Sequence, residues 1–354
     1  MRKVPASIAI SLLAAVMLGC LFYTSGCSES QANAEEILTR AVTQFSGAKS
    51  YHMQMDGSLE MTSNGPVKDA QLSSLLPLKL TLSGQADMDI RDPEQIKLKI
   101  YDLSIGGLAE AVSKADSLGG NGAQRALTAG MFSQMLNGME LVIIKDTFYM
   151  KMTGMWFKIS ANDIPSSNGV DFGCLFNISG QESGVSSISG DYLKDIEELP
   201  QEDLDGVTTR HFKASLDGSK MADQVSQSFA DLQKCGFDQK TSGVGGDAYS
   251  GIDDVKKFYQ ILYDRMRIEY WVDSDLKVHR MALSISANFG EMMAAMGEAP
   301  DQEIEPLNFS FVITADISHQ GEDFEISAPE NALPLKDILN DGTETAAPTK
   351  RQAG

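Results

Sequence analysis

The chain has 354 residues, a formal net charge of −20 and a hydrophobic content of 42%. The mean hydropathy of −0.16 excludes a protein with many membrane spans, and the hydrophobic content excludes a chain that stays disordered. Because so acidic a surface repels phosphate groups, nucleic acid is excluded as a partner.

The N-terminal segment has the layout of a secretory signal. Arg2 and Lys3 precede an apolar stretch over residues 8–18, which is too short to be read first as a membrane-spanning helix. The sequence TSGC, which ends at Cys27, resembles a bacterial lipobox. In such a motif the cysteine receives diacylglycerol and becomes the first residue of the mature protein. We therefore expect Cys27 to be lipidated.

Lipidation predicts a protein that is held at a membrane surface outside the cytoplasm. Two acyl chains, palmitate among them, are enough for stable anchoring. We expect residues 1–26 to be removed as the signal peptide and residues 27–33 to form a tether. Three alternatives stay open: Cys20 as the lipidated residue, an uncleaved N-terminal anchor, and the outer membrane as the location if the host has one.

Residues 34–46 predict an amphipathic helix, since their apolar residues fall on one helical face. The apolar period then changes from 3.6 residues to 2. Apolar and polar residues alternate along residues 51–61, 78–90 and 96–100, which predicts long half-buried strands. Turn residues at 91–94 make the last two of these strands a hairpin.

Strands and helical insertions alternate along the rest of the chain. A glycine-containing insertion at about 105–137 is expected to include a helix, residues 165–190 are expected to be loop, and further helices are expected within about 218–263. The other predicted elements are strands at 140–144, 148–152, 156–159, 207–216, 268–272, 278–287, 308–318 and 324–326, an acidic turn at 197–206 and a disordered tail at 341–354. This pattern predicts an α+β fold, with one domain over residues 34–340.

Catalytic and metal-binding motifs are missing from the sequence. It contains no G-x-S-x-G, S-x-x-K or H-E-x-x-H segment, and its four histidines do not have metal-ligand spacing. We therefore expect no enzyme activity, no metal and no cofactor. Cys174 and Cys235 are the other cysteines of the mature chain and predict a disulfide in an oxidising compartment, with two separate buried thiols as the alternative.

Eighteen methionines are a high number for this length, and many lie on the predicted strand faces. Methionine fills irregular apolar space and tolerates a changing partner. One interpretation is an ordinary sheet core. The other is an elongated apolar cavity that the helices cover incompletely, with the glycine-containing insertion as a movable cover.

Several segments resemble the LolA/LppX-like lipoproteins: ILTRAVTQFSGAKSYHMQMDGSLEM, FYMKMTGMWFKIS, LPQEDLDGVTTRHFKASLD, YWVDSDLKVHRMALSIS and FEISAPENALPL. The resemblance implies a strongly curved antiparallel half-barrel with helices covering its concave face, where acyl chains bind, and it brings no catalytic residues. The expected pocket residues are the apolar positions Met53, Met55, Leu59, Leu80, Leu82, Met88, Leu98, Ile100 and Trp156.

The function that follows is a membrane-anchored extracytoplasmic lipoprotein that binds or carries a lipid or another long apolar ligand. Its expected partners are lipid or lipoprotein acyl chains, together with the membrane that holds its N-terminal anchor. The alternative is a non-catalytic envelope lipoprotein with a collapsed interior, which acts as a scaffold or sensor and binds another envelope protein.

Overall fold

The computed structural model describes residues 33–67, 73, 76–92, 97–107, 110, 139–152, 154–160, 190–234, 252–295 and 307–335. Cys27, Cys174, Cys235, the tail and most of the insertion at 105–137 lie outside these residues. None of the described helices has an apolar stretch of the length that crossing a bilayer requires.

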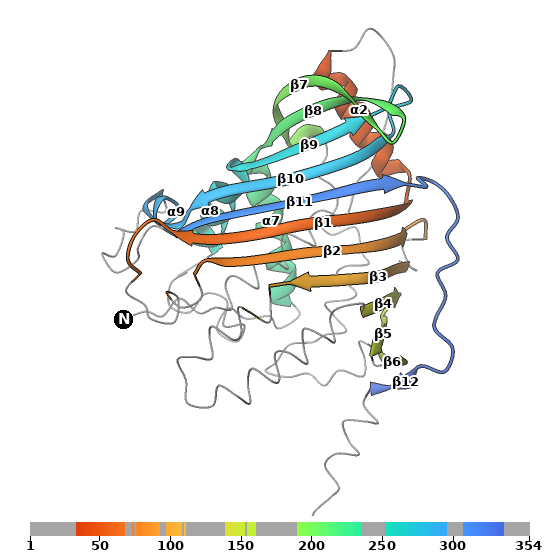
Figure 1. Ribbon diagram of the computed structural model, residues 1–354. Helices are drawn as coiled ribbons and strands as arrows, with labels where there is room; N and C mark the ends of the chain where they lie inside the picture. Colours follow the sequence, from red (N-terminus) through yellow and green to blue (C-terminus); the bar gives the residue numbers. More distant parts are fainter. Residues whose placement is uncertain are drawn as a thin grey trace, which may run out of the picture.

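One curved, open sheet of 12 strands organises the described part of the chain (Figure 1). Its order is β12-β6-β5-β4-β3-β2-β1-β11-β10-β9-β8-β7, and every neighbouring pair is antiparallel except β12 with β6. The two edge strands, β7 and β12, are not paired with each other, so the sheet is a half-barrel. The strands are β1 (Ser50–Ser63), β2 (Leu78–Asp89), β3 (Lys97–Gly106), β4 (Met139–Ile144), β5 (Thr147–Met152), β6 (Met155–Ser160), β7 (Leu193–Leu204), β8 (Val207–Leu216), β9 (Met266–Val272), β10 (Val278–Asn288), β11 (Leu307–Ser318) and β12 (Leu333–Pro334).

The helices cover one face of this sheet, which we call the inner face. Figure 1 shows α2, α7 and α8 behind the strands, and buried side chains of these three helices share one apolar core with the sheet. The helical elements are α2 (Ala34–Gly47), the short 3₁₀ helix η2 (Gly190–Tyr192), α7 (Gly218–Lys234), α8 (Ile252–Asp264) and α9 (Phe289–Ala295). Helices on the inner face confirm the predicted α+β half-barrel.

Helix α2 begins where the sequence predicts it. The Asn33 side chain accepts a hydrogen bond from the Glu36 backbone N–H at 2.9 Å, which caps the first turn. The helix buries Leu38, Val42 and Phe45 against the sheet, and the Phe45 ring lies 5.1 Å from that of Tyr51 at the start of β1. The helix and the first strand therefore pack as one unit.

Cross-strand register aligns the apolar residues of the inner face into rows. One row runs over five strands, and all of its side chains lie in the apolar core or pack against it. Its members are Met55, Ala315, Met281, Tyr270 and Phe212. Paired residues of neighbouring strands point to the same face, so each row extends the same apolar surface around the curve.

Irregularities in pairing accompany the curvature on the β2 to β4 side. The β2–β3 register shifts between Ser83 and Gln85, and the β3–β4 register shifts between Ile100 and Leu103. Asp102 lies within both irregular stretches of β3 and has a φ of 55°. Such bulges increase the local twist of a sheet and bend the bulged strand, so they contribute to the curvature of this sheet.

The predicted acidic turn at residues 197–206 is wrong, because most of it belongs to edge strand β7. Only Asp205 and Gly206 form the turn into β8, and both have positive φ, 54° and 85°. Charged side chains suit a sheet edge, where they face water and discourage pairing with another chain. Charge alone therefore did not separate a turn from an edge strand.

The predicted strand at 324–326 is also absent, since these residues have no strand pairing in the structure. They belong to a segment, residues 319–332, that we call the strap. It runs past the ends of the strands from β11 to β12 (Figure 1). Ile326 is 5% exposed, so one apolar side chain anchors the strap without a ladder of backbone hydrogen bonds.

Arg91 connects the strap to the end of β2. Its guanidinium pairs with Asp323 on the strap and with Asp89, with Nη2 2.6 Å from Asp89 Oδ2. The hydrogen bond from Arg91 lowers the pKa of Asp89, against the opposing effect of burial. The carboxylate form of Asp89 is therefore favoured by the fold.

We expect Phe212→Ala to lower the free energy of unfolding by about 3–5 kcal/mol, because the side chain is fully buried in the inner-face row. Urea denaturation measures the change. The control Lys213→Ala, on the opposite face of β8, should change stability by less than about 0.5 kcal/mol. Equal losses in the two variants would contradict the assigned faces.

We expect the stabilising effect of Arg91 to depend on pH. The folded-state pKa of Asp89 lies below its ordinary value, so the contact stabilises above about pH 4 and is lost as the pH falls through the folded value. The stability difference between wild type and Arg91→Ala, measured by urea denaturation at a series of pH values, should shrink on acidification. In an Asp89→Asn background most of this pH dependence should disappear, because the other carboxylate that Arg91 contacts, Asp323, is exposed. A pH dependence as large as in the wild-type background would contradict the assignment to Asp89.

Candidate functional site: the apolar inner wall

Eight of the nine residues expected to line a pocket lie on the inner face. They pair across three strands: Leu59 with Leu80, and Met88 with both Tyr51 and Leu98. On the middle strand, β2, Ala86 pairs with Met53 of β1 on one side and with Ile100 of β3 on the other. We call the apolar inner face of β1 to β6 the inner wall.

Burial differs from residue to residue along the inner wall. Met53, Leu59 and Met88 are at most 7% exposed and belong to the shared core. The other five expected residues are half-buried and pack against that core. They are Met55, Leu80, Leu82, Leu98 and Ile100. The wall thus has a deeply packed part and a part with accessible apolar surface.

The wall continues onto β4, β5 and β6, where Trp156 is the one residue that the sequence resemblance places in the pocket. Ile100 pairs with Leu141, Leu141 with Met150, and Met150 with Phe157, so these four residues share one face. Ile143, Phe148 and Ile159 form a second row beside them. The alternation in the segments FYMKM and MWFKIS contains this signal.

Trp156 lies on the outer face of the sheet, opposite the inner wall. Its neighbour Phe157 is the inner residue of β6, and successive residues of a strand point to opposite faces. Trp156 pairs instead with Lys151, whose ammonium lies 5.8 Å from the indole centroid. The register therefore places Trp156, one of the expected pocket residues, one residue out of phase with the inner wall.

The outer face carries polar clusters that hold the strands together. His52 Nδ1 lies 2.7 Å from Asp87 Oδ1, and the Tyr101 hydroxyl lies 3.1 Å from the same nitrogen. Burial, together with the Asp87 charge, raises the pKa of Tyr101 to about 12. At neutral pH its hydroxyl therefore stays protonated and donates to Asp87, which suits a structural contact.

A second cluster ties edge strand β7 to β8 and β9. The His211 ring is stacked on Trp271 at 4.1 Å, and its two nitrogens lie 3.0 Å from Glu202 and 2.8 Å from Glu269. Trp271 Nε1 donates to the other oxygen of Glu202. Both histidine nitrogens are occupied by these contacts. Among the described residues, no group of acidic, histidine or cysteine side chains is arranged to hold a metal ion.

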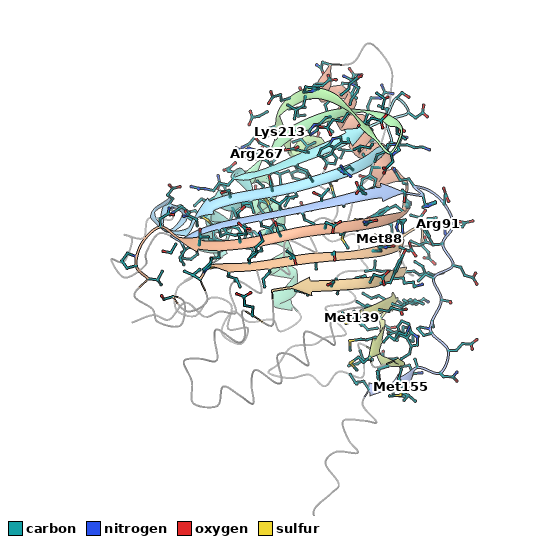
Figure 2. The ribbon with its side chains drawn as sticks, viewed as in Figure 1. Met88, Arg91, Met139, Met155, Lys213 and Arg267 are labelled. Carbon is teal, nitrogen blue, oxygen red and sulfur yellow. The ribbon has the colours of Figure 1, made fainter. Side chains whose placement is uncertain are left out.

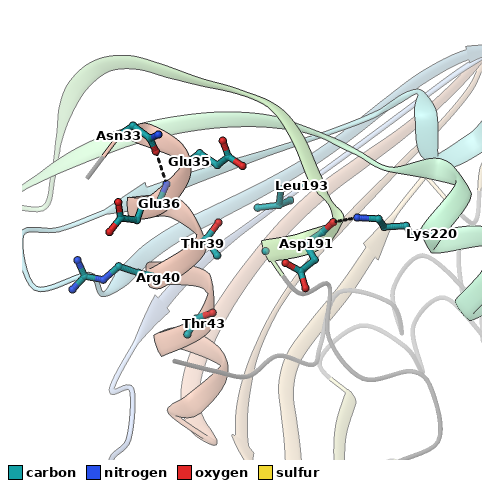
Figure 3. A pocket seen from close by; sticks show the side chains of 10 residues that line it. Asn33, Glu35, Glu36, Thr39, Arg40, Thr43, Asp191, Leu193 and Lys220 are labelled. Atoms are coloured by element: carbon teal, nitrogen blue, oxygen red, sulfur yellow. Dashed lines mark hydrogen bonds between the residues drawn. The ribbon is translucent and has the colours of Figure 1, made fainter. Parts of the chain in front are cut away.

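A polar pocket of about 700 Å³ lies between α2, η2 and the start of α7 (Figure 3). Arg40 and Lys220 bring positive charges to it, and Glu35, Glu36 and Asp191 bring negative ones. Lys220 Nζ donates to the Asp191 carbonyl oxygen at 2.7 Å. Charged groups of both signs do not suit an acyl chain, so the inner wall is the better candidate for an apolar ligand.

No protein-family model matches the chain, and no curated protein is similar to it. It is similar to the solved structure of the lipoprotein LppX from Mycobacterium tuberculosis, with 11% sequence identity and a TM-score of 0.35 over 82% of this chain and 98% of LppX. It is also similar to LprF from Mycobacterium bovis, with 14% identity and a TM-score of 0.37 over 84% of this chain and 96% of LprF. A third similar structure is that of a LolA superfamily protein from Nitrosomonas europaea, with 9% identity and a TM-score of 0.18 over 84% of this chain and 98% of that protein. The open, curved antiparallel sheet with helices on its inner face is the LolA/LppX-like architecture that the sequence segments imply.

Proposed function

We propose that this protein is an extracytoplasmic lipoprotein that binds a lipid, or another long apolar ligand, along the inner wall. The observation that carries the proposal is the continuation of the apolar wall from β1 to β6, with half-buried side chains beyond the fully packed core. An acyl chain placed there gains about 0.8 kcal/mol for each methylene group removed from water.

The half-buried residues would form the ligand-contacting part of the wall. Leu82, Leu98 and Ile100 lie between the packed core and the apolar rows of β4 to β6. Met53, Leu59 and Met88 would support this surface from within the core. Trp156 has no place in the proposed pocket, because it lies on the outer face.

Binding of this kind needs no chemical step by the protein. The polar clusters of the outer face are engaged in contacts between strands, and the inner wall presents apolar side chains. Burial of apolar surface would supply the affinity, and release would require only that the ligand become exposed again. The partners would then be acyl chains of lipids or lipoproteins.

Anchoring through Cys27 is the second part of the proposal. The residues from Ser28 to Ala32 would separate the lipidated cysteine from the helix cap at Asn33, and an extended chain spans at most about 3.6 Å per residue. The start of α2 would therefore stay within roughly 20 Å of the membrane surface. In that oxidising compartment we also propose a disulfide between Cys174 and Cys235.

We expect a secreted form of residues 28–354, which contains every described residue, to carry bound lipid after gentle purification from its native host. Native mass spectrometry measures the occupied fraction. Ile100→Gln should lower that fraction roughly tenfold, since a polar amide on the wall costs about 1–3 kcal/mol when it is desolvated. Lys99→Gln, one residue along on the outer face, should leave it unchanged.

A homogeneous ligand-free wild type would contradict the binding proposal and favour a scaffold with a collapsed interior. Equal loss of lipid in the Ile100 and Lys99 variants would also contradict it, because the effect would then not belong to the inner wall.

We expect Cys27→Ala to abolish incorporation of an alkyne-labelled palmitate in cells, because the acylated residue is lost. Click labelling followed by gel fluorescence measures incorporation. Cys20→Ala should keep the label and serves as the matched control. The opposite pattern would identify Cys20 as the lipidated residue.

A further inference from the structure

The outer face of β3 to β6 carries lysine and aromatic side chains that the proposed binding function does not use. Lys99, Val142, Tyr149 and Lys158 form one row by strand pairing. Glu140, Lys151 and Trp156 form the next. All of these residues lie opposite the inner wall, because they alternate with its members along each strand.

We call Lys99, Tyr101, Tyr149, Lys151, Trp156 and Lys158 the lysine–aromatic face. Lys99 lies 5.3 Å from the Tyr101 ring centroid, and Lys151 lies 5.8 Å from that of Trp156. Lys151 also forms an ion pair with Glu140. In the described part of the chain, Lys99 and Lys158 have no ion pair, so their charges remain available to a partner.

Charge separates this end of the sheet from the rest of the protein. Strands β3 to β6 contain four lysines against two acidic residues, a net charge of +2 on a chain of −20. Edge strand β7, at the opposite end of the sheet, contains five acidic residues against one lysine. A negatively charged partner is therefore attracted to one edge and repelled from the other.

Exposed apolar side chains lie at the same edge. Met155 at the start of β6 is 52% exposed, and Leu333 on β12 is 46% exposed. Leu333 pairs with Phe157 and Met155 with Met152, so both belong to the inner side of the edge. Figure 2 labels Met155 at this end of the sheet. Apolar groups on one side and lysines with aromatic rings on the other give the edge an amphipathic character.

We propose that the β6–β12 edge docks on an anionic lipid surface. Tryptophan and tyrosine favour the interface between lipid and water, lysine stems reach along apolar surface toward charged headgroups, and each lysine near an anionic surface strengthens binding about fivefold. Met155 and Leu333 enter the apolar boundary of the bilayer. The contact is separate from the Cys27 anchor, which precedes α2 on the β7 to β10 side, and it does not require a ligand on the inner wall.

Trp156 is a reporter inside the proposed contact. The chain has two tryptophans, and Trp271 is 7% exposed and stacked on His211. In residues 28–354 carrying Trp271→Phe, vesicles of phosphatidylglycerol and phosphatidylcholine with brominated acyl chains should quench Trp156 fluorescence and shift it to the blue. Phosphatidylcholine vesicles should do neither. In about 1 M NaCl, where the Debye length is about 3 Å, the anionic vesicles should lose most of their effect.

Co-sedimentation of residues 28–354 with the same vesicles tests the charges without altering either tryptophan. The double variant Lys99→Gln/Lys158→Gln should bind at least tenfold more weakly, from about fivefold for each lysine. The matched control Lys213→Gln/Lys277→Gln removes the same charge near the opposite edge, where Figure 2 labels Lys213, and should bind like wild type.

No binding of the wild type to anionic vesicles would overturn the proposal, as would equal binding to neutral vesicles or an equal loss in the control variant. Ile100→Gln separates this proposal from the lipid-binding function, since it should lose bound lipid and still sediment with vesicles. Loss of vesicle binding in Ile100→Gln, with the fold retained by circular dichroism, would overturn the independence of the two surfaces.

Discussion

Strict alternation of apolar residues along paired antiparallel strands is the constraint on which the rest of this structure depends. Because paired residues point to the same face, a slip of one residue in any strand would turn its apolar set toward water. The rows through Met55 and Phe212 and through Ile100 and Phe157 hold this register across both halves of the sheet. Gly57 allows β1 and β11 to pair closely, since a Cβ at this position would lie 3.1 Å from the Val312 carbonyl oxygen. The helices are then required on one face only.

The same alternation explains how much of the fold could be predicted. A period of two residues is a local property, so the ends of the strands from β1 to β6 and from β8 to β11 were predicted within two residues, with one exception. Strand β3 continues to Gly106, six residues past the end predicted at Ile100. Strand β7 was missed because its acidic residues resemble a turn, and only its position at the sheet edge, a property of the whole fold, explains them. Residues 324–326 of the strap were predicted as a strand because their apolar residues also alternate, but they have no neighbouring strand to pair with.

The candidate site was predictable to the extent that it follows from single strands. Eight expected residues share the inner face because each strand was assigned the correct phase. Trp156 was assigned the wrong phase: β6 has aromatic residues at two successive positions, and only the pairing with β5 shows that Phe157 is the inner one. The rows through Leu141 and Phe148 depend on pairing across β3, β4 and β5, with a bulge between them. A bulge changes register without a local sequence signature, so the extent of the wall could not be read from the sequence.

An open half-barrel has two sheet edges whose unpaired backbone groups could pair with another strand. The two edges of this sheet differ in the side chains they carry. At β7 the acidic side chains, two register shifts and a proline disfavour pairing with any further strand. At β6 the described partner is the two-residue strand β12, and neighbouring apolar side chains remain exposed. Negative charge that protects one edge also makes it unsuited to an anionic surface, whereas the other edge combines apolar and positively charged groups. The distribution of charge along the sheet therefore gives the half-barrel a polarity that its backbone topology alone does not have.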